Sequence, residues 1–218
     1  INIGATAAAV PTPIEGTGAD NNLNGTAGDD VLLGYGGNDT IHGNGGHDHI
    51  EGGAGNDTLY GDAGNDALLG GVGTHILQGG IGNDTLIGGL GPDTLTGGAG
   101  HDTFKWLAGE ADGSIDKIAD FTLGLSGSNA NSDVLDLSQL LVDVPASANN
   151  SVLAGTLNSY LTFDTANNTL TIDTNGGTAG GDQLTVLFQN APSFSSGSNQ
   201  DIIKQLLDDG NLKVDPHP

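Results

Sequence analysis

The sequence predicts a mainly β protein, a parallel β-solenoid of the β-roll type followed by an α/β capping region. Three observations lead to this prediction. A nine-residue unit repeats from Gly25 to Lys105 without a change of register. From Leu153 onward the sequence alternates in the manner of strands and contains one helical segment. The chain carries 27 acidic and 4 basic residues, a net charge of -23, so a compact roll needs a source of positive charge.

The nine-residue copies share the same residue type at the same positions. The fourth position is always Gly, and the eighth is always large and apolar, from Leu32 to Phe104. The sixth position is His75 in one copy. In the other copies the sixth position is Asp: Asp30, Asp39, Asp48, Asp57, Asp66, Asp84, Asp93 and Asp102.

This pattern predicts a coil made of two copies. Positions one to six are rich in Gly, Asn and Asp, which tolerate tight turns. Positions seven to nine form a short strand of three residues whose middle side chain faces inward. Strand, turn, strand and turn close one coil, so copies two frames apart stack on the same side.

The stacked turns can supply oxygen ligands. Alternate carbonyls of an extended turn point to opposite sides, so one turn offers positions two and four plus its Asp. The next turn on that side offers positions one and three plus its Asp, and six oxygens suit Ca²⁺. A Gly/Asn-rich disordered linker is the alternative, but disorder gives no reason for an apolar residue at every ninth position.

The repeat, GGxGxDxUx, resembles the nonapeptide of RTX proteins, a calcium-binding parallel β-roll. The resemblance implies several Ca²⁺ ions and five ligand sets, each taken from two turns. On one side they are Thr26, Gly28 and Asp30 with Gly43, Gly45 and Asp48; Asn44, Gly46 and Asp48 with Gly61, Ala63 and Asp66; Asp62, Gly64 and Asp66 with Gly79, Ile81 and Asp84; and Gly80, Gly82 and Asp84 with Gly97, Ala99 and Asp102. On the other side the set is Tyr35, Gly37 and Asp39 with Gly52, Ala54 and Asp57.

Two places depart from the repeat. A neutral imidazole is a poor ligand for a hard ion, so His75 weakens the sites it would share with Asp57 and with Asp93. The stretch from Gly16 to Asn24 fits the same frame as a degenerate first copy. Its Asn21 stands at the Asp position and completes a weaker site with Asp39.

These features divide the chain into three parts. Residues 1–15 are an N-terminal strand and linker, residues 16–105 the calcium-binding roll, and residues 106–218 the cap with a type I secretion target region. After the repeat, four carboxylates either bind further calcium or serve as turn and capping groups: Asp116, Asp120, Asp133 and Asp136.

The cap is expected to contain three strands, YLTFD, TLTID and LTVLF, then a helix from Gln200 to Asp209 and a short last strand LKVD. Together with LDLSQLL, this order resembles the C-terminal target region of type I-secreted bacterial proteins, notably very large adhesins. The resemblance implies an uncleaved export signal around Gln200 to Asp215.

Several functions are disfavoured. The sequence has no GxSxG or HExxH motif, so no catalytic residues are expected. The acidic charge disfavours nucleic acid and anionic membranes, and without a twenty-residue apolar run we expect no membrane insertion. With no Cys, the redox compartment cannot be read from the sequence.

We therefore expect a non-catalytic, calcium-dependent folding and secretion module at the C-terminus of a large bacterial RTX adhesin. It would be extracellular, secreted or on the cell surface, and a monomeric domain of a larger chain. Its partners would be calcium and the type I secretion machinery. The alternatives are an accessory domain of a secreted protease, lipase or polysaccharide epimerase, and a carbohydrate-binding roll.

Overall fold

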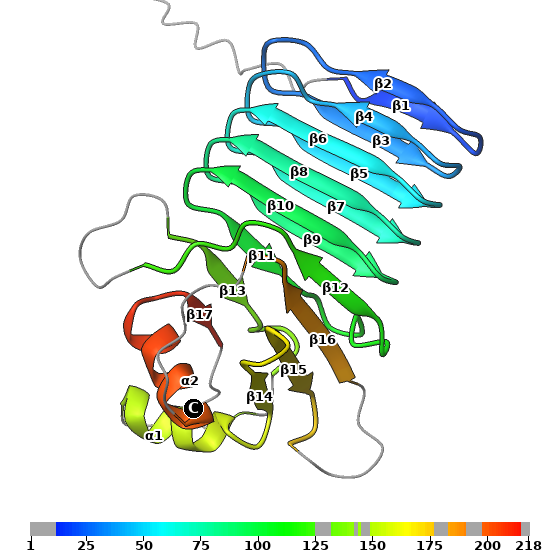
Figure 1. Ribbon diagram of the computed structural model, residues 1–218. Helices are drawn as coiled ribbons and strands as arrows, with labels where there is room; N and C mark the ends of the chain where they lie inside the picture. Colours follow the sequence, from blue (N-terminus) through cyan, green and yellow to red (C-terminus); the bar gives the residue numbers. More distant parts are fainter. Residues whose placement is uncertain are drawn as a thin grey trace, which may run out of the picture.

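The computed structural model describes residues 12–124, 132–141, 144, 149–176, 183–190 and 198–214. Over these residues the chain forms a β-roll with an α/β cap at one end, which confirms the predicted fold class (Figure 1). The strand expected within residues 1–10 lies outside the described residues.

Successive strands of the roll alternate between two parallel sheets, as the two-copy coil requires. The first sheet contains β1 (Ile14–Thr17), β3 (Val31–Tyr35), β5 (His49–Ala54), β7 (Ala67–Val72), β9 (Thr85–Leu90) and β11 (Thr103–Lys105). The second contains β2 (Asn22–Asn24), β4 (Thr40–His42), β6 (Thr58–Ala63), β8 (Ile76–Ile81) and β10 (Thr94–Ala99). Leu32 lies beside Ile50 and Ile41 beside Leu59, so equivalent positions stack.

The strands differ from the expectation in two respects. The central strands have six residues, because pairing continues into the first three positions of the next copy, as where Gly53 lies beside Gly71. β1 begins at Ile14, inside the stretch expected to be a linker, and Ile14 pairs with Leu32. Ile14 thus occupies an eighth position of the frame and extends the roll by one strand.

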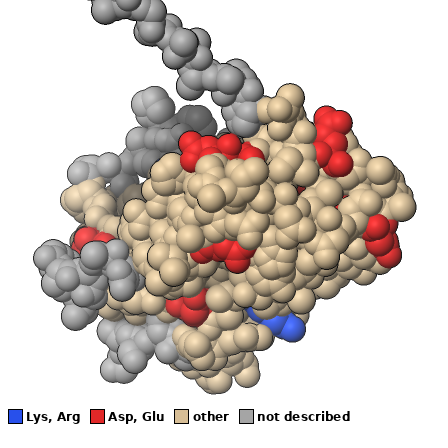
Figure 2. All heavy atoms as spheres, turned by 90° about the horizontal axis from the view of Figure 1, so that it is seen from above, with Lys and Arg blue, Asp and Glu red and all other residues tan. Residues whose placement is uncertain are grey.

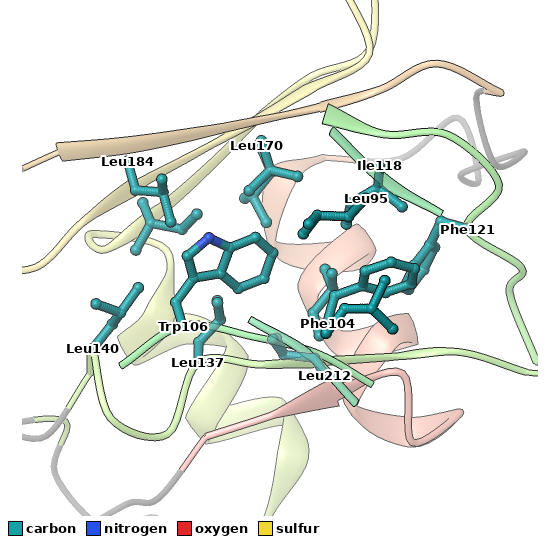
Figure 3. Packing of buried hydrophobic residues seen from close by; sticks show 14 of the residues in the cluster. Leu95, Phe104, Trp106, Ile118, Phe121, Leu137, Leu140, Leu170, Leu184 and Leu212 are labelled. Carbon is teal, nitrogen blue, oxygen red and sulfur yellow. The ribbon is translucent and has the colours of Figure 1, made fainter. Parts of the chain in front are cut away.

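The core of the roll consists of the side chains at the eighth position, one row from each sheet. From Leu32 to Phe104 all of them are buried, and Phe104 and Trp106 extend the core into the cap (Figure 3). Fully burying a side chain of this size contributes roughly 1.5–3 kcal/mol. Because each strand supplies only one such side chain, the turns must contribute to holding the coils together.

The cap continues both sheets of the roll. β12 (Ile115–Ile118) pairs with β10 and is followed in space by β16 (Gln183–Phe188), β15 (Thr169–Asp173) and β14 (Leu161–Asp164). β13 (Val134–Asp136) pairs with β11, and β17 (Leu212–Lys213) pairs with β13. The C-terminal stretch therefore supplies the last strand of the first sheet.

Two helices cover the end of the cap. α2 (Asn199–Asp208) was expected within one residue of its observed bounds and buries Ile202, Ile203 and Leu206. It lies against α1 (Asn150–Leu157), which the sequence did not predict. Within the described ranges no helix is long and apolar enough to span a bilayer.

Candidate metal sites

The sixth-position side chains form two columns inside the turns, one along each side of the roll. Seven of them are nearly fully buried, at 1–3% exposure: Asp39, Asp48, Asp57, Asp66, Asp84, Asp93 and Asp102. Asp30, in the first full copy, is half-buried. Buried carboxylates of this number require partners, because burying an unpaired charge is costly.

One oxygen of each carboxylate has such a partner. The backbone N–H of each sixth residue donates to Oδ1 of the Asp in the next turn on its side, except that the Asp57 N–H donates to His75 Nδ1. Asp48 N donates to Asp66 Oδ1 and Asp66 N to Asp84 Oδ1, both at 2.8 Å. Asp39 N donates to Asp57 Oδ1 at 2.8 Å in the other column. These bonds fix the spacing between turns at eighteen residues.

The other oxygen has none. Oδ2 of each of these seven aspartates is buried and accepts no hydrogen bond. It also faces another acceptor: a Cβ built on Gly61 would lie 2.6 Å from Asp66 Oδ2 and 2.5 Å from the Gly79 carbonyl oxygen. Two buried acceptors without a donor between them need a cation, and an all-oxygen set suits Ca²⁺.

The same convergence occurs in all five predicted ligand sets. In each set an Asp Oδ2 and the first-position carbonyl oxygen of the next turn both lie close to a Cβ built on the first glycine of the Asp's copy. The pairs are Asp30–Gly43, Asp39–Gly52, Asp48–Gly61, Asp66–Gly79 and Asp84–Gly97. The third-position carbonyls of Ala54, Ala63, Ile81 and Ala99 each accept an N–H bond of 2.8–3.0 Å from the turn before. Each carbonyl oxygen keeps a second lone pair, so this bond leaves it able to face an ion.

The second position of the frame is conformationally special. Tyr35, Asn44 and Asp62 each have φ of 71°, in the left-handed region that non-glycine residues rarely adopt. Most other copies have Gly there. The turn therefore imposes one backbone path on every copy from Gly34 onward, and this path sets the directions of their second-position carbonyls, which the ligand sets include.

Burial dominates the electrostatics of the columns. Burial raises the pKa of Asp48 to about 6 and those of Asp84 and Asp93 to about 7. In each case a backbone N–H bond opposes this shift and neighbouring carboxylates add to it. Burial lowers the pKa of the His75 imidazole. Asp48, Asp84 and Asp93 therefore have no positively charged group beside them that would offset their burial.

No three His, Asp or Glu side chains gather into a metal-binding cluster in the part of the chain that the structure describes. Ions in the turns would rely on main-chain carbonyls, with each carboxylate shared between neighbouring turns. This is the composition that the predicted ligand sets have.

The first members of the columns are partly satisfied by their own turns. Asn21 Oδ1 accepts the Thr17 N–H at 2.6 Å, and Asp30 Oδ2 accepts the Thr26 N–H at 2.6 Å and the Thr26 hydroxyl at 2.8 Å. The sequence did not indicate these bonds. They make the sites at Asn21 and Asp30 less dependent on a cation than those further along.

The cap carries both columns one step further. Asp93 N donates to Asp116 Oδ1 at 3.0 Å and Asp102 N to Asp133 Oδ1 at 3.1 Å. Their second oxygens have donors, since Asp116 Oδ2 accepts the Trp106 Nε1–H at 2.8 Å.

Asp133 Oδ2 accepts the Thr122 N–H at 2.7 Å. Asp120 accepts the amides of Gly97 and Gly98, and Asp136 accepts from Lys213 and Ser138. Of the two alternatives for these four carboxylates, the hydrogen bonds support the capping role.

A second ladder, at the fifth position, was missed. Asn56 N donates to Asn38 Oδ1 and Asn65 N to His47 Nδ1, both at 2.8 Å, and Asn83 N donates to Asn65 Oδ1 at 2.7 Å. The signal was present in the sequence as recurrent Asn, Asp and His at this position. This ladder ties the outside of the turns together without metal.

The fold and the site define a β-roll whose turns bring buried carboxylate and carbonyl oxygens together. Residues 15–50, 42–74 and 76–105 match the family described as RTX calcium-binding nonapeptide repeat (4 copies). The roll is thus built of RTX calcium-binding repeats. No curated protein is significantly similar to the chain in sequence.

Among solved structures, the chain is similar to the AlgE6R3 subunit of a mannuronan C5-epimerase from Azotobacter vinelandii. The two share 23% identity over 86% of each chain, with a TM-score of 0.37.

Proposed function

We propose that this chain is a non-catalytic module that folds by binding several Ca²⁺ ions and serves the secretion of a bacterial adhesin. The observation that carries the calcium part is the set of buried Oδ2 atoms without a hydrogen-bond donor, five of which face a carbonyl oxygen of the next turn: those of Asp39, Asp48, Asp57, Asp66 and Asp84. Bound calcium would supply the positive charge that these acceptors lack. The residues that would hold it are the five ligand sets named from the sequence.

Calcium and folding are coupled in this proposal because the roll has few other sources of stability. Its core is one side chain per strand, and its columns are carboxylates at short spacing. Extracellular modules bind Ca²⁺ with dissociation constants of roughly 10⁻⁴–10⁻³ M. The roll would therefore remain open in the cytosol and close outside the cell.

Far-UV circular dichroism with excess chelator, and again after adding calcium, tests this coupling. We expect most β-structure to be lost on chelation and regained with Ca²⁺, while an equal concentration of Mg²⁺ restores little. Mg²⁺ serves as the control because it prefers a smaller octahedral shell and retains its waters. A spectrum that stays the same after prolonged chelation would contradict the proposal.

The secretion part is supported by the order of elements at the C-terminus, three strands, a helix and a last strand. We propose that α2 and the following residues carry an export signal for a type I exporter, read before the chain folds. In the folded molecule Ile202, Ile203 and Leu206 are buried, whereas Asp208 is exposed. We place the folded module outside the cell, as a monomeric part of a larger adhesin.

Deleting residues 198–218 tests the signal. We expect export through a type I system to be abolished, with the chain retained in the cells. Glu51→Gln, on the exterior of the roll, is the matched control and should be exported normally. Export of the truncated chain at the level of the control would show that the tail only caps the roll.

A further inference from the structure

His75 stands in the second column between Asp57 and Asp93 and is completely buried. Its Nδ1 accepts the Asp57 N–H at 3.1 Å, the part that Oδ1 plays in other turns. Its own N–H donates to Asp93 Oδ1 at 2.8 Å. The hydrogen-bond ladder therefore passes through His75 without a break. What changes is which atoms line the two gaps beside it, one between the turns of Asp57 and His75 and one between the turns of His75 and Asp93.

The upper gap, between the turns of His75 and Asp93, has lost its oxygen. In intact turns an Asp Oδ2 lies against the first glycine of its own copy, opposite the carbonyl of the next turn. In the copy of His75 that glycine is Gly70. A Cβ built there would meet the Gly88 carbonyl oxygen and two ring carbons of His75, Cδ2 at 2.7 Å and Cγ at 2.8 Å. Carbon occupies the place of the ligand atom.

The lower gap, between the turns of Asp57 and His75, keeps the pairing of an Asp Oδ2 with a first-position carbonyl oxygen. A Cβ built on Gly52 would meet Asp57 Oδ2 and, at 2.8 Å, the Gly70 carbonyl oxygen, the same pair as in intact turns. Asp57 Oδ2 is buried and without a hydrogen bond. His75 Nδ1 lies 3.4 Å from it but already accepts the Asp57 N–H, so it has no proton to donate to that oxygen.

We propose that His75 closes only the upper gap, and that the lower gap is a Ca²⁺ site built on Asp57 Oδ2 and the Gly70 carbonyl. By the frame, its remaining ligands are the carbonyls of Gly53, Gly55 and Val72. The site has one carboxylate where intact gaps have two, and it binds more weakly for that reason. This inference rests on the proposed calcium-dependent folding and predicts that His75 costs the roll one ion.

Native mass spectrometry in saturating calcium counts the ions. His75→Asp should bind one ion more than the wild type, because it restores an Oδ2 to the upper gap and leaves the lower gap as filled as before. A gain of two ions would mean that both gaps are empty in the wild type, and no gain would mean that the ring does not close the upper gap. Either result overturns the inference.

A second comparison addresses the lower gap directly. Asp66→Asn alters a carboxylate between two intact gaps, and Asp57→Asn makes the same change beside one intact gap and the lower gap. We expect both variants to lose the same number of ions. If Asp57→Asn loses one ion fewer, the lower gap is empty and the inference fails.

Circular dichroism of each variant in calcium confirms that the roll is formed before ions are counted. A wild type that binds no calcium would instead refute the proposed function, so the two failures are distinguishable.

Discussion

At the scale of single residues, the fourth-position glycine shows how tightly the coils stack. Gly64 has φ of +149°, and a Cβ there would collide with the Gly46 carbonyl one coil away. Gly28 holds the same place in the first full copy, where, among the residues that the structure describes, a Cβ would meet only Thr26 Oγ1 at 3.9 Å. From Gly37 onward, the requirement for this glycine therefore follows from the backbone of the coil stacked before it.

Gly64→Ala should consequently lower the free energy of unfolding of the calcium-bound roll. We expect a loss of at least about 1–3 kcal/mol, the cost of a residue held in a sparsely populated conformation, with the collision added. Gly28→Ala is the matched control and should be near neutral. Urea unfolding in saturating calcium measures both, and equal losses would contradict the stacking argument.

The buried aspartates make the metal-free roll sensitive to pH. Burial, with the neighbouring Asp102 and Asp66 adding to it, raises the pKa of Asp84 to about 7, against about 3.9 in an unfolded chain. A carboxyl whose pKa is higher when folded costs no stability below pH about 4. The free energy of unfolding that it removes grows as the pH rises and reaches its full value above about 7.

In chelator, therefore, acidification from pH about 8 to about 5 should increase the β-structure measured by circular dichroism. With calcium present the trend should reverse, because protons then compete with the ion for the same oxygens. A metal-free sample that loses structure on acidification would contradict the assigned pKa directions.

At the scale of elements, the repeat frame predicted every strand of the roll except β1, because each copy from Gly16 onward carries its apolar residue at the same position. It did not predict strand length, since the glycines after each strand have no side chain to reveal that pairing continues through them.

α1 was missed for a different reason. The stretch NSVLAGTL has Gly, Ser, Thr and Asn in place of strong helix formers. The helix depends on the Asn149 cap, whose side chain accepts the Ser151 and Val152 amides, and on contact with α2. Tertiary packing of this kind leaves no periodic signal in a segment of eight residues.

The junction of roll and cap contains a buried side-chain hydrogen bond in addition to its strand pairing. Trp106 is fully buried and its Nε1–H is the donor for Asp116 Oδ2. Trp106→Phe keeps most of the apolar volume and leaves that carboxylate oxygen unpaired, so we expect a loss of about 1–3 kcal/mol.

Urea unfolding of Trp106→Phe, Asp116→Asn and the double variant forms a cycle that isolates the bond. If the free energy of unfolding lost in the double variant equals the sum of the losses in the two single variants, the bond does not stabilise the junction.

At the scale of the whole molecule, charge is distributed unevenly along the chain. The basic residues are Lys105, Lys117, Lys204 and Lys213, so no Lys or Arg precedes the last residue of β11. Figure 2 shows acidic side chains at several places on one face of the molecule and basic ones only at one edge. The charge and the Asp spacing allowed the type of site to be predicted from the sequence.

The ends of the columns could not be predicted in this way. Asp116 and Asp133 join the columns through bonds to Asp93 and Asp102, 23 and 31 residues away, outside the nine-residue frame. Likewise, the buried Asn211 joins the tail to the cap by donating to the Asp133 carbonyl and accepting the Gly124 N–H. Such contacts follow from where the cap folds back, which the sequence pattern does not encode locally.

Because alternate copies lie in opposite sheets, the roll behaves as a screw in which length and facing are linked. Removing one copy, Gly70 to Gln78, leaves every remaining copy in frame and brings the eight aspartates into two unbroken columns. It also turns everything before the cut by half a revolution relative to the cap. Removing two copies, Gly61 to Gln78, restores the original facing.

The chain has no Cys, so spin labels on Asn22→Cys in β2 and Lys117→Cys in β12, both exposed and on the same sheet, report this rotation. The labels should lie on one face in the intact and two-copy-deleted chains and on opposite faces after the one-copy deletion. Distances that only shorten in both deletions would refute the screw. In that case copy number would set only the length of the molecule. In the expected case the alternation of sheets makes copy number also set the direction in which the N-terminal coils face.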